Sequence, residues 1–173
     1  CKFKDENGIG DDKTVTAGEI FDYIFAVMNS NKYKDAYGSF LKIDFPKIPY
    51  PSGIQYFRDM ASIGRELQQI EMLDFELPTD VFTFVSTSPI SVVEKIQYKN
   101  NSVSINKKGD KFINIPETLW TAYVGGYQPL QKWLQDRKGR QLTPECITEY
   151  QKIAFALHTR ETIINEIDLT IRL

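Results

Sequence analysis

Apolar residues recur every three or four positions early in the chain, which predicts helices within 17–73. Thr16 is followed three residues later by Glu19, the pattern of a capping box at a helix N-terminus. Prolines at 46, 49 and 51 exclude helix there and predict a stiff, extended connection. A longer helix is expected at roughly 54–73. Its buried face is marked by Ile54, Phe57, Ala61, Gly64, Leu67 and Ile70.

After Pro78 the apolar period changes to two, which is typical of β-strands. Alternation from residue 91 onward predicts a small antiparallel sheet or meander at about 91–115. The stretches "KNNS" (99–102) and "KKGD" (107–110) contain turn residues that tolerate positive φ. They therefore mark the connections between the predicted strands.

Helical spacing returns at about 129–173. Gly139 fits the position just past a helix C-terminus, and Thr143 followed by Pro144 fits the start of a final helix. The whole pattern predicts an α+β fold, a helical body whose two helical groups flank the small antiparallel sheet. We expect a loop or linker at 1–15 and a single domain at 16–173.

Composition favours a soluble, globular protein, because 42% of the 173 residues are hydrophobic and 25% are charged. No apolar run approaches the length of a membrane span, so we expect no membrane partner. The two cysteines, Cys1 and Cys146, are far apart in the sequence and do not suggest a disulfide framework. A reducing, cytoplasmic setting is therefore the expectation.

The net charge of -2 conceals one basic block. Residues 95–140 contain nine Lys or Arg against three Asp or Glu, whereas residues 1–94 have a net charge of -6 and residues 141–173 a net charge of -2. Such a block can attract a polyanion despite an acidic total. It is also compatible with a solvated, lysine-rich hairpin, and the pattern alone leaves both interpretations open.

Residues with catalytic potential are sparse. His158 is the one histidine, and its helical neighbours offer no catalytic partner. Metal sites need clustered His, Cys or carboxylate ligands, and the sequence shows no such cluster. Walker A and GxGxxG motifs are also missing from the sequence, so we expect no catalytic residue, metal or cofactor in this chain.

Gly125 and Gly126 are the most distinctive local feature. Paired glycines allow a sharp turn, here between the sheet and the helix expected at 129. They also allow the backbone N–H groups and Tyr127 to approach a phosphate or a base edge, with a helix N-terminus behind them. Both interpretations remain open at this point.

Three stretches carry a resemblance to one family. They are "IFDYIFAVMNSNKYKDAYGSFLKIDFPKIPYP" (20–51), "IGRELQQIEML" (63–73) and "LWTAYVGGYQPLQKWLQDRKGRQLTPECITEYQKI" (119–153). Together they resemble the C-terminal specificity domain of Type ISP restriction-modification enzymes, single chains that combine an adenine-N6 DNA methyltransferase with a translocase and a nuclease. The resemblance implies a DNA target-recognition domain that positions double-stranded DNA for a catalytic domain located elsewhere.

The same resemblance implies a division of labour within the parent chain. A methyltransferase core of this kind uses an Asn-Pro-Pro-Tyr type motif for the flipped adenine, and this sequence has none. We therefore expect S-adenosylmethionine to bind in the parent's catalytic domain, and we expect this chain to be non-catalytic.

On this interpretation the block at 95–140 faces DNA. Cations would bind phosphates, amide side chains would read adenine, and the glycine turn would approach the DNA backbone. The predicted DNA-binding residues are Asn106, Lys107, Lys108, Lys111, Gly125, Gly126, Tyr127, Gln128, Lys132, Arg137, Lys138 and Arg140.

The main alternative is a helical protein-interaction module without direct DNA contact. The helices at 17–73 and 143–173 would then pack on a partner, such as the methyltransferase core of the same polypeptide, while the basic block is only solvated. A small enzyme is the weakest alternative, because the sequence shows no nucleophile and base in a recognisable pair.

Overall fold

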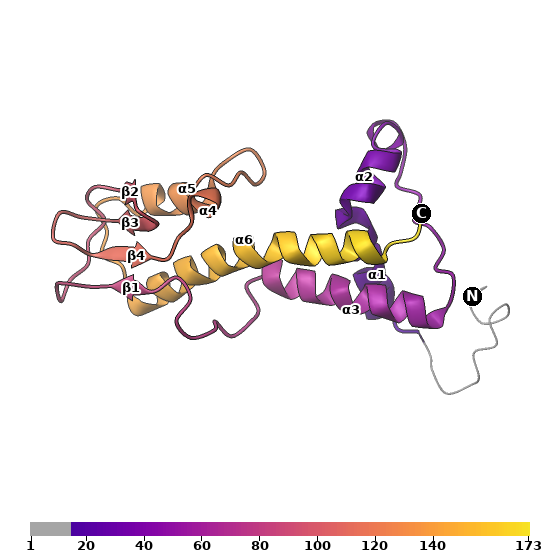
Figure 1. The fold of residues 1–173 in the computed structure, drawn as a ribbon, viewed down its shortest axis with the longest axis horizontal. Helices are drawn as coiled ribbons and strands as arrows, with labels where there is room; N and C mark the ends of the chain where they lie inside the picture. The colour runs from indigo at the N-terminus through magenta and orange to yellow at the C-terminus, as the bar shows by residue number, and fades with distance from the viewer. Residues whose placement is uncertain (1–14) are drawn as a thin grey trace. The chain divides into compact units, whose positions relative to one another are not determined.

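The computed structural model describes residues 15–173, and the chain divides into two compact units. Unit 1 comprises Cys1–Asp74 and Arg160–Leu173, and unit 2 comprises Phe75–Thr159. The single domain predicted at 16–173 thus consists of two units, coloured in chain order in Figure 1. The loop or linker predicted at 1–15 lies, up to residue 14, outside the described residues.

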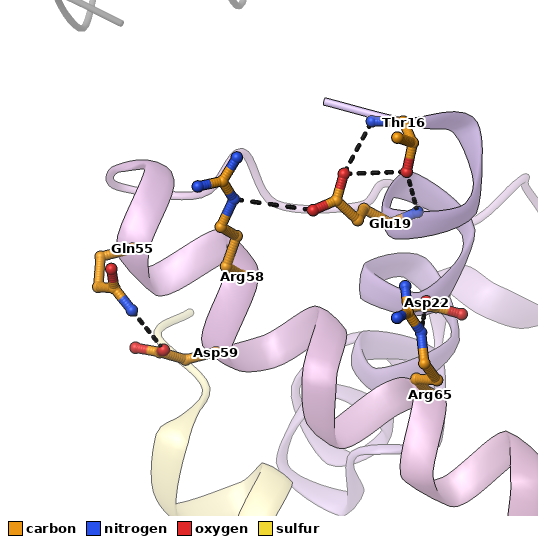
Figure 2. Close-up of polar contacts among 7 residues, drawn as sticks. All are labelled: Thr16, Glu19, Asp22, Gln55, Arg58, Asp59 and Arg65. Atoms are coloured by element: carbon orange, nitrogen blue, oxygen red, sulfur yellow. Dashed lines mark hydrogen bonds and ion pairs between the residues drawn. The ribbon is translucent and has the colours of Figure 1, made fainter. Parts of the chain in front are cut away.

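Unit 1 begins with helix α1 (Ala17–Asn29), whose N-terminus has the predicted capping box. The Thr16 hydroxyl accepts a hydrogen bond from the Glu19 backbone N–H at 3.2 Å, and the Glu19 carboxylate accepts one from the Thr16 N–H at 2.8 Å (Figure 2). Helix α2 (Asn31–Tyr37), the 3-10 turn η2 (Phe40–Lys42) and helix α3 (Ile54–Glu71) follow. The predicted helix at 54–73 is therefore confirmed, with its end two residues earlier.

Helices α1 and α3 pack in very close contact at Gly64. A Cβ atom at this position would lie 2.0 Å from the backbone oxygen of Asp22, so only glycine allows the approach. Beside this contact, the Arg65 guanidinium donates to the buried Asp22 carboxylate at 2.9 Å (Figure 2). The ion pair satisfies a carboxylate that burial would otherwise leave without a partner.

The proline-rich connection between η2 and α3 is held by two buried tyrosines. The Tyr23 hydroxyl donates to the carbonyl oxygen of Pro49 at 2.8 Å, and the Tyr33 hydroxyl donates to that of Lys47 at 3.1 Å. The predicted extended connection therefore lies against the core of unit 1 through its backbone.

Unit 2 contains a four-stranded antiparallel sheet in the order β1-β4-β3-β2. Its strands are β1 (Phe84–Val85), β2 (Gln97–Lys99), β3 (Ser102–Ser104) and β4 (Lys111–Ile113). Asn100 and Asn101 both have positive φ and form the two-residue turn expected from "KNNS". The α+β prediction is confirmed, but residues 91–96 form no strand; only Val92 pairs, as an isolated bridge with Gln141.

Three helices complete the fold: α4 (Glu117–Trp120), α5 (Pro129–Asp136) and α6 (Pro144–Thr170). Thr143 caps α6 as predicted, because its hydroxyl accepts from the Cys146 N–H at 3.3 Å. Leu130, Trp133 and Leu134 of α5 pack with strand residues such as Val103 and Phe112 in one core. Trp133 is thus a core residue, as its spacing indicates. Residues 160–170 of α6 belong to unit 1.

A candidate nucleic-acid interface on unit 2

The turn between β3 and β4 is organised by Asn106. Its side-chain oxygen accepts hydrogen bonds from the backbone N–H groups of Lys108, Gly109 and Asp110, at 3.0 to 3.2 Å. Its amide nitrogen donates to Asp110 at 2.8 Å and to the Val92 carbonyl at 3.3 Å. This closed geometry leaves the neighbouring cations, Lys107 and Lys108, exposed on the outside of the turn.

These contacts bear on the interpretation of Asn106 as a base reader. Asn106 is buried, and both polar atoms of its side chain bond within unit 2. Reading a base edge would require these hydrogen bonds to be given up. The structure therefore shows that Asn106 shapes the turn, and base reading by Asn106 stays a prediction.

Asp110 joins the same turn to the loop that follows β1. Its carboxylate is fully buried and accepts hydrogen bonds from the Thr87 N–H at 2.7 Å, the Thr87 hydroxyl at 3.1 Å and the Ser88 hydroxyl at 3.1 Å. Burial acts to raise the pKa of Asp110, but the hydrogen bonds from Thr87 and Asn106 outweigh it and hold the pKa well below its usual range. The charged carboxylate therefore fixes the two loops together.

Asp110→Asn should make unit 2 less stable at neutral pH, by on the order of 2 kcal/mol, because charged hydrogen bonds are lost. Since the folded-state pKa of Asp110 is lowered, its stabilising effect is present above the unfolded value of about 3.9 and decreases as the pH falls below it. Melting curves between pH 7 and pH 3 should show the variant and the parent converging in acid. A constant difference in stability between Asp110→Asn and the parent over this pH range would contradict this role.

A second basic turn lies beside the first. The Val93 N–H donates to the Arg140 carbonyl at 3.0 Å, and the Gly139 N–H donates to the Val93 carbonyl at 2.7 Å. Because Val92 also accepts from Asn106, residues 91–93 connect both turns. We call Lys107, Lys108, Lys138 and Arg140 the basic turns; all four are exposed, and none forms an ion pair with residues 15–173.

The other predicted cations have different surroundings. Lys111 is half-buried on β4. Lys132 pairs with Asp136 one helical turn away, at 2.5 Å. Arg137 lies 3.5 Å from the centre of the Trp133 ring and pairs with Glu149 at 3.2 Å. Lys132 and Arg137 thus have ion-pair partners within unit 2, whereas the four cations of the basic turns have none among the described residues.

Gly125 and Gly126 form a tight hairpin between α4 and α5. Both have positive φ, and the N–H and carbonyl groups of Val124 and Tyr127 pair across them, as in a two-residue turn. Gln128 braces the hairpin by donating to the Thr121 carbonyl at 3.3 Å. The interpretation as a turn is confirmed. Tyr123 and Tyr127, on either side of the glycine turn, are exposed, so an additional contact role stays a prediction.

The structure separates this glycine hairpin from the basic turns. The hairpin precedes the first residue of α5, whereas Lys138 and Arg140 follow its last residue. An eight-residue helix is about 12 Å long. Figure 1 shows the hairpin as the loop before α5, at the end of unit 2 away from the β3–β4 turn. The sequence block at 95–140 therefore forms two separate features.

The loop at 86–91 contributes none of the predicted DNA-binding residues, but it joins the site through Asp110. Ser86, Thr87 and Ser88 bond to Asp110, and the Ser91 carbonyl accepts from the Leu142 N–H at 2.8 Å. The hydroxyl residues clustered in "STSPIS" (86–91) could have indicated this contact, because a buried aspartate such as that of "KKGD" (107–110) needs hydrogen-bond donors.

Within residues 15–173, no helix combines the length and apolarity needed to cross a membrane. Over the same residues, His, Cys, Asp and Glu side chains are nowhere grouped in threes as a metal site would require. The described chemistry of unit 2 is therefore that of exposed cations, a buried carboxylate and an aromatic hairpin.

Comparison with solved structures shows the same fold in three proteins solved with DNA or a DNA substrate mimic. A nuclease-deletion mutant of the Type ISP restriction-modification enzyme LlaGI, in complex with a DNA substrate mimic, matches with a TM-score of 0.63 and 18% identity over 88% of this chain and 14% of its own. The ATP-dependent Type ISP restriction-modification enzyme LlaBIII bound to DNA matches with a TM-score of 0.59 and 15% identity, over 92% of this chain and 11% of its own. The DrdV–DNA complex matches with a TM-score of 0.61 and 19% identity, over 88% of this chain and 18% of its own.

This chain thus spans between 11% and 18% of the length of these structural relatives. No curated protein matches the sequence significantly. The family described as the Type ISP C-terminal specificity domain matches residues 2–166, nearly the whole chain. The chain belongs to the Type ISP C-terminal specificity domain family.

Proposed function

We propose that this chain is the DNA target-recognition part of a longer Type ISP restriction-modification polypeptide. The observation that carries the proposal is the meeting of two basic turns across residues 91–93, which places Lys107, Lys108, Lys138 and Arg140 on one unit. Flexible, unpaired cations bind the phosphate backbone of a duplex and set its register. Family membership supports DNA as the polyanion.

The charge distribution favours unit 2 over unit 1 as the DNA-facing part. Unit 2 has ten Lys or Arg against eight Asp or Glu, and unit 1 has eleven against fifteen. The pairs Lys132–Asp136 and Arg137–Glu149 each remove one charge of either sign, whereas Asp110 is buried and removes a negative charge alone from the exposed surface. The exposed surface of unit 2 is therefore more basic than its composition indicates.

The glycine hairpin is the second proposed contact. Its tight turn allows the backbone of Gly125 and Gly126 to approach a phosphate, and the exposed Tyr127 ring provides a flat surface for contact with DNA. Gln128 lies at the base of the hairpin and is an amide candidate for reading a base. Phosphate contacts at the basic turns would position this end of unit 2 on the duplex.

The proposal also covers the activity of the longer polypeptide to which this chain would belong. We propose that the parent is an adenine-N6 DNA methyltransferase located in the cytoplasm. S-adenosylmethionine would bind in its catalytic domain, and this chain would contribute target choice without catalytic residues. The methyltransferase core of the same polypeptide would be its protein partner.

Binding of the 173-residue chain to a random-sequence duplex, measured by fluorescence anisotropy at several salt concentrations, tests the proposal. Non-specific dissociation constants of roughly 10⁻⁴ to 10⁻⁶ M are expected. If each of the four cations of the basic turns contacts one phosphate, the slope of log affinity against log salt should be about -3.6. An affinity that is absent at low salt, or independent of salt, would favour the protein-interaction alternative.

A further inference from the structure

A short apolar segment of unit 1 faces solvent. Phe40, Ile43 and Phe45 are 62%, 82% and 88% exposed, and they lie within six residues of one another. Single exposed apolar side chains are ordinary, but a group of large ones on one segment is typical of an interaction site. We call these three residues the apolar strap.

The backbone of the strap is ordered even though its side chains are exposed. The N–H groups of Ile43 and Asp44 donate to the Phe40 carbonyl at 3.0 and 2.9 Å, and the Phe45 N–H donates to the Asp44 carboxylate at 2.7 Å. Immediately afterwards, the buried hydroxyls of Tyr33 and Tyr23 hold the backbone at Lys47 and Pro49. Ordering a segment before binding lowers the entropy that binding must later remove.

Helix α1 shows a second exposed apolar area on the same unit. One side packs through Tyr23, Ala26 and Val27, which are buried, whereas Ile20 and Met28 are exposed. A helix that is apolar around its circumference is typical of a buried helix rather than a solvated one. Unit 1 thus has more apolar surface than its own core covers.

We propose that the apolar strap docks on a protein surface of the longer Type ISP polypeptide, outside this chain. This rests on the proposed function only for the existence of that polypeptide. Unit 1 as a whole has four more carboxylates than Lys and Arg, and exposed apolar side chains do not complement the charged phosphates of DNA.

The size of the strap favours a covalently linked partner over a second copy. A stable interface between free proteins involves roughly 20–30 residues on each side, far more than three side chains. A partner on the same polypeptide is present at a high effective concentration, so a small apolar contact is sufficient. The structural relatives are several times longer than this chain, which leaves most of such a polypeptide available as the partner.

Photo-crosslinking in the full-length polypeptide tests the proposal. A benzophenone amino acid at Phe45 should crosslink to peptides outside residues 1–173. The control is the same amino acid at Glu66, an exposed residue of α3, which should give a yield at least fivefold lower. Crosslinks to residues 75–159, to a second copy or to DNA, or equal yields from both positions, would overturn the docking site.

A substitution pair provides a second test. In the isolated chain, Ile43→Ser with Phe45→Ser should leave the melting temperature and the salt slope of DNA binding unchanged, because both side chains are exposed. In the full-length polypeptide it should accelerate proteolytic release of this domain about tenfold, whereas Lys42→Ser with Lys47→Ser should not. Equal release rates, or a lower melting temperature of the isolated variant, would overturn the proposal. Loss of DNA binding by the unsubstituted chain would instead contradict the proposed function.

Discussion

Reversing the charges of Lys138 and Arg140 should weaken binding of the chain to every DNA duplex. Each lost phosphate contact lowers the magnitude of the log–log salt slope by about 0.9, so Lys138→Glu with Arg140→Glu should lower it by about 1.8. If the double variant and the parent bind equally at 1 M salt, a slope difference of about 1.8 over one decade makes the variant roughly 60-fold weaker at 0.1 M salt. Because phosphates carry no sequence information directly, cognate and random duplexes should be affected alike. Anisotropy titrations at four or more salt concentrations measure both quantities.

The matched control is Lys42→Glu with Lys47→Glu, which makes the same change in charge on exposed residues of unit 1. This control should retain most of the affinity and the parent's slope. Equal losses in both double variants would show that only net charge matters. A folded Lys138→Glu/Arg140→Glu variant with parental affinity would move the DNA contact away from the basic turns, toward the glycine hairpin or the loop at 86–91.

Gly64→Ala should destabilise unit 1 severely for such a small change. The added Cβ would lie 2.0 Å from the backbone oxygen of Asp22, so helices α1 and α3 must move apart. Overpacking typically costs about 1–3 kcal/mol, and a contact with backbone, which cannot rotate away, favours the upper end. Since 1 kcal/mol shifts the melting temperature of a 60–100-residue unit by about 4–8 °C, we expect a decrease of roughly 10–20 °C.

Gly18→Ala is the control for this prediction. Gly18 lies in the first turn of α1, where the nearest atom to an added Cβ is the Thr16 hydroxyl oxygen at 3.9 Å. With room available, alanine should stabilise the helix by up to about 1 kcal/mol because it restricts the unfolded chain. A loss of stability in Gly64→Ala together with a gain in Gly18→Ala would separate the effect of packing from that of helix propensity. An unchanged melting temperature for Gly64→Ala would show that α1 and α3 can separate without cost.

Features determined by local chemistry were predictable from the sequence. The capping box at Thr16 and Glu19, the cap at Thr143 and the turn at Asn100 and Asn101 each depend on a few adjacent residues. The Gly125–Gly126 turn belongs to the same class. In each case the side chain satisfies or permits a backbone geometry next to it, so no distant contact has to be known.

Features determined by long-range contacts were not predictable in the same way. Asn106 has the donor and acceptor groups that reading a base requires, but its amide nitrogen donates hydrogen bonds to Val92 and Asp110. The alternation at 91–96 is typical of a strand, yet Val93 bonds to Gly139 and Arg140 instead of a strand neighbour. Strand β1 is two residues long, too short for any period to show. The pairing of Arg137, just past the end of α5, with Glu149 of α6 likewise depends on two separate elements.

The order of the two units along the chain has a consequence for synthesis on the ribosome. Unit 2 is continuous, whereas unit 1 needs the last part of α6, where Asp168 accepts from the Ser30 hydroxyl at 2.6 Å and Ile167 is fully buried. Domains generally fold as their residues leave the ribosome. Here the nascent chain can complete the basic, sheet-containing unit first, while α1 and α3 wait with part of their apolar surface uncovered. Within residues 15–173, the helices that are translated before unit 2 are therefore the last to reach their native contacts.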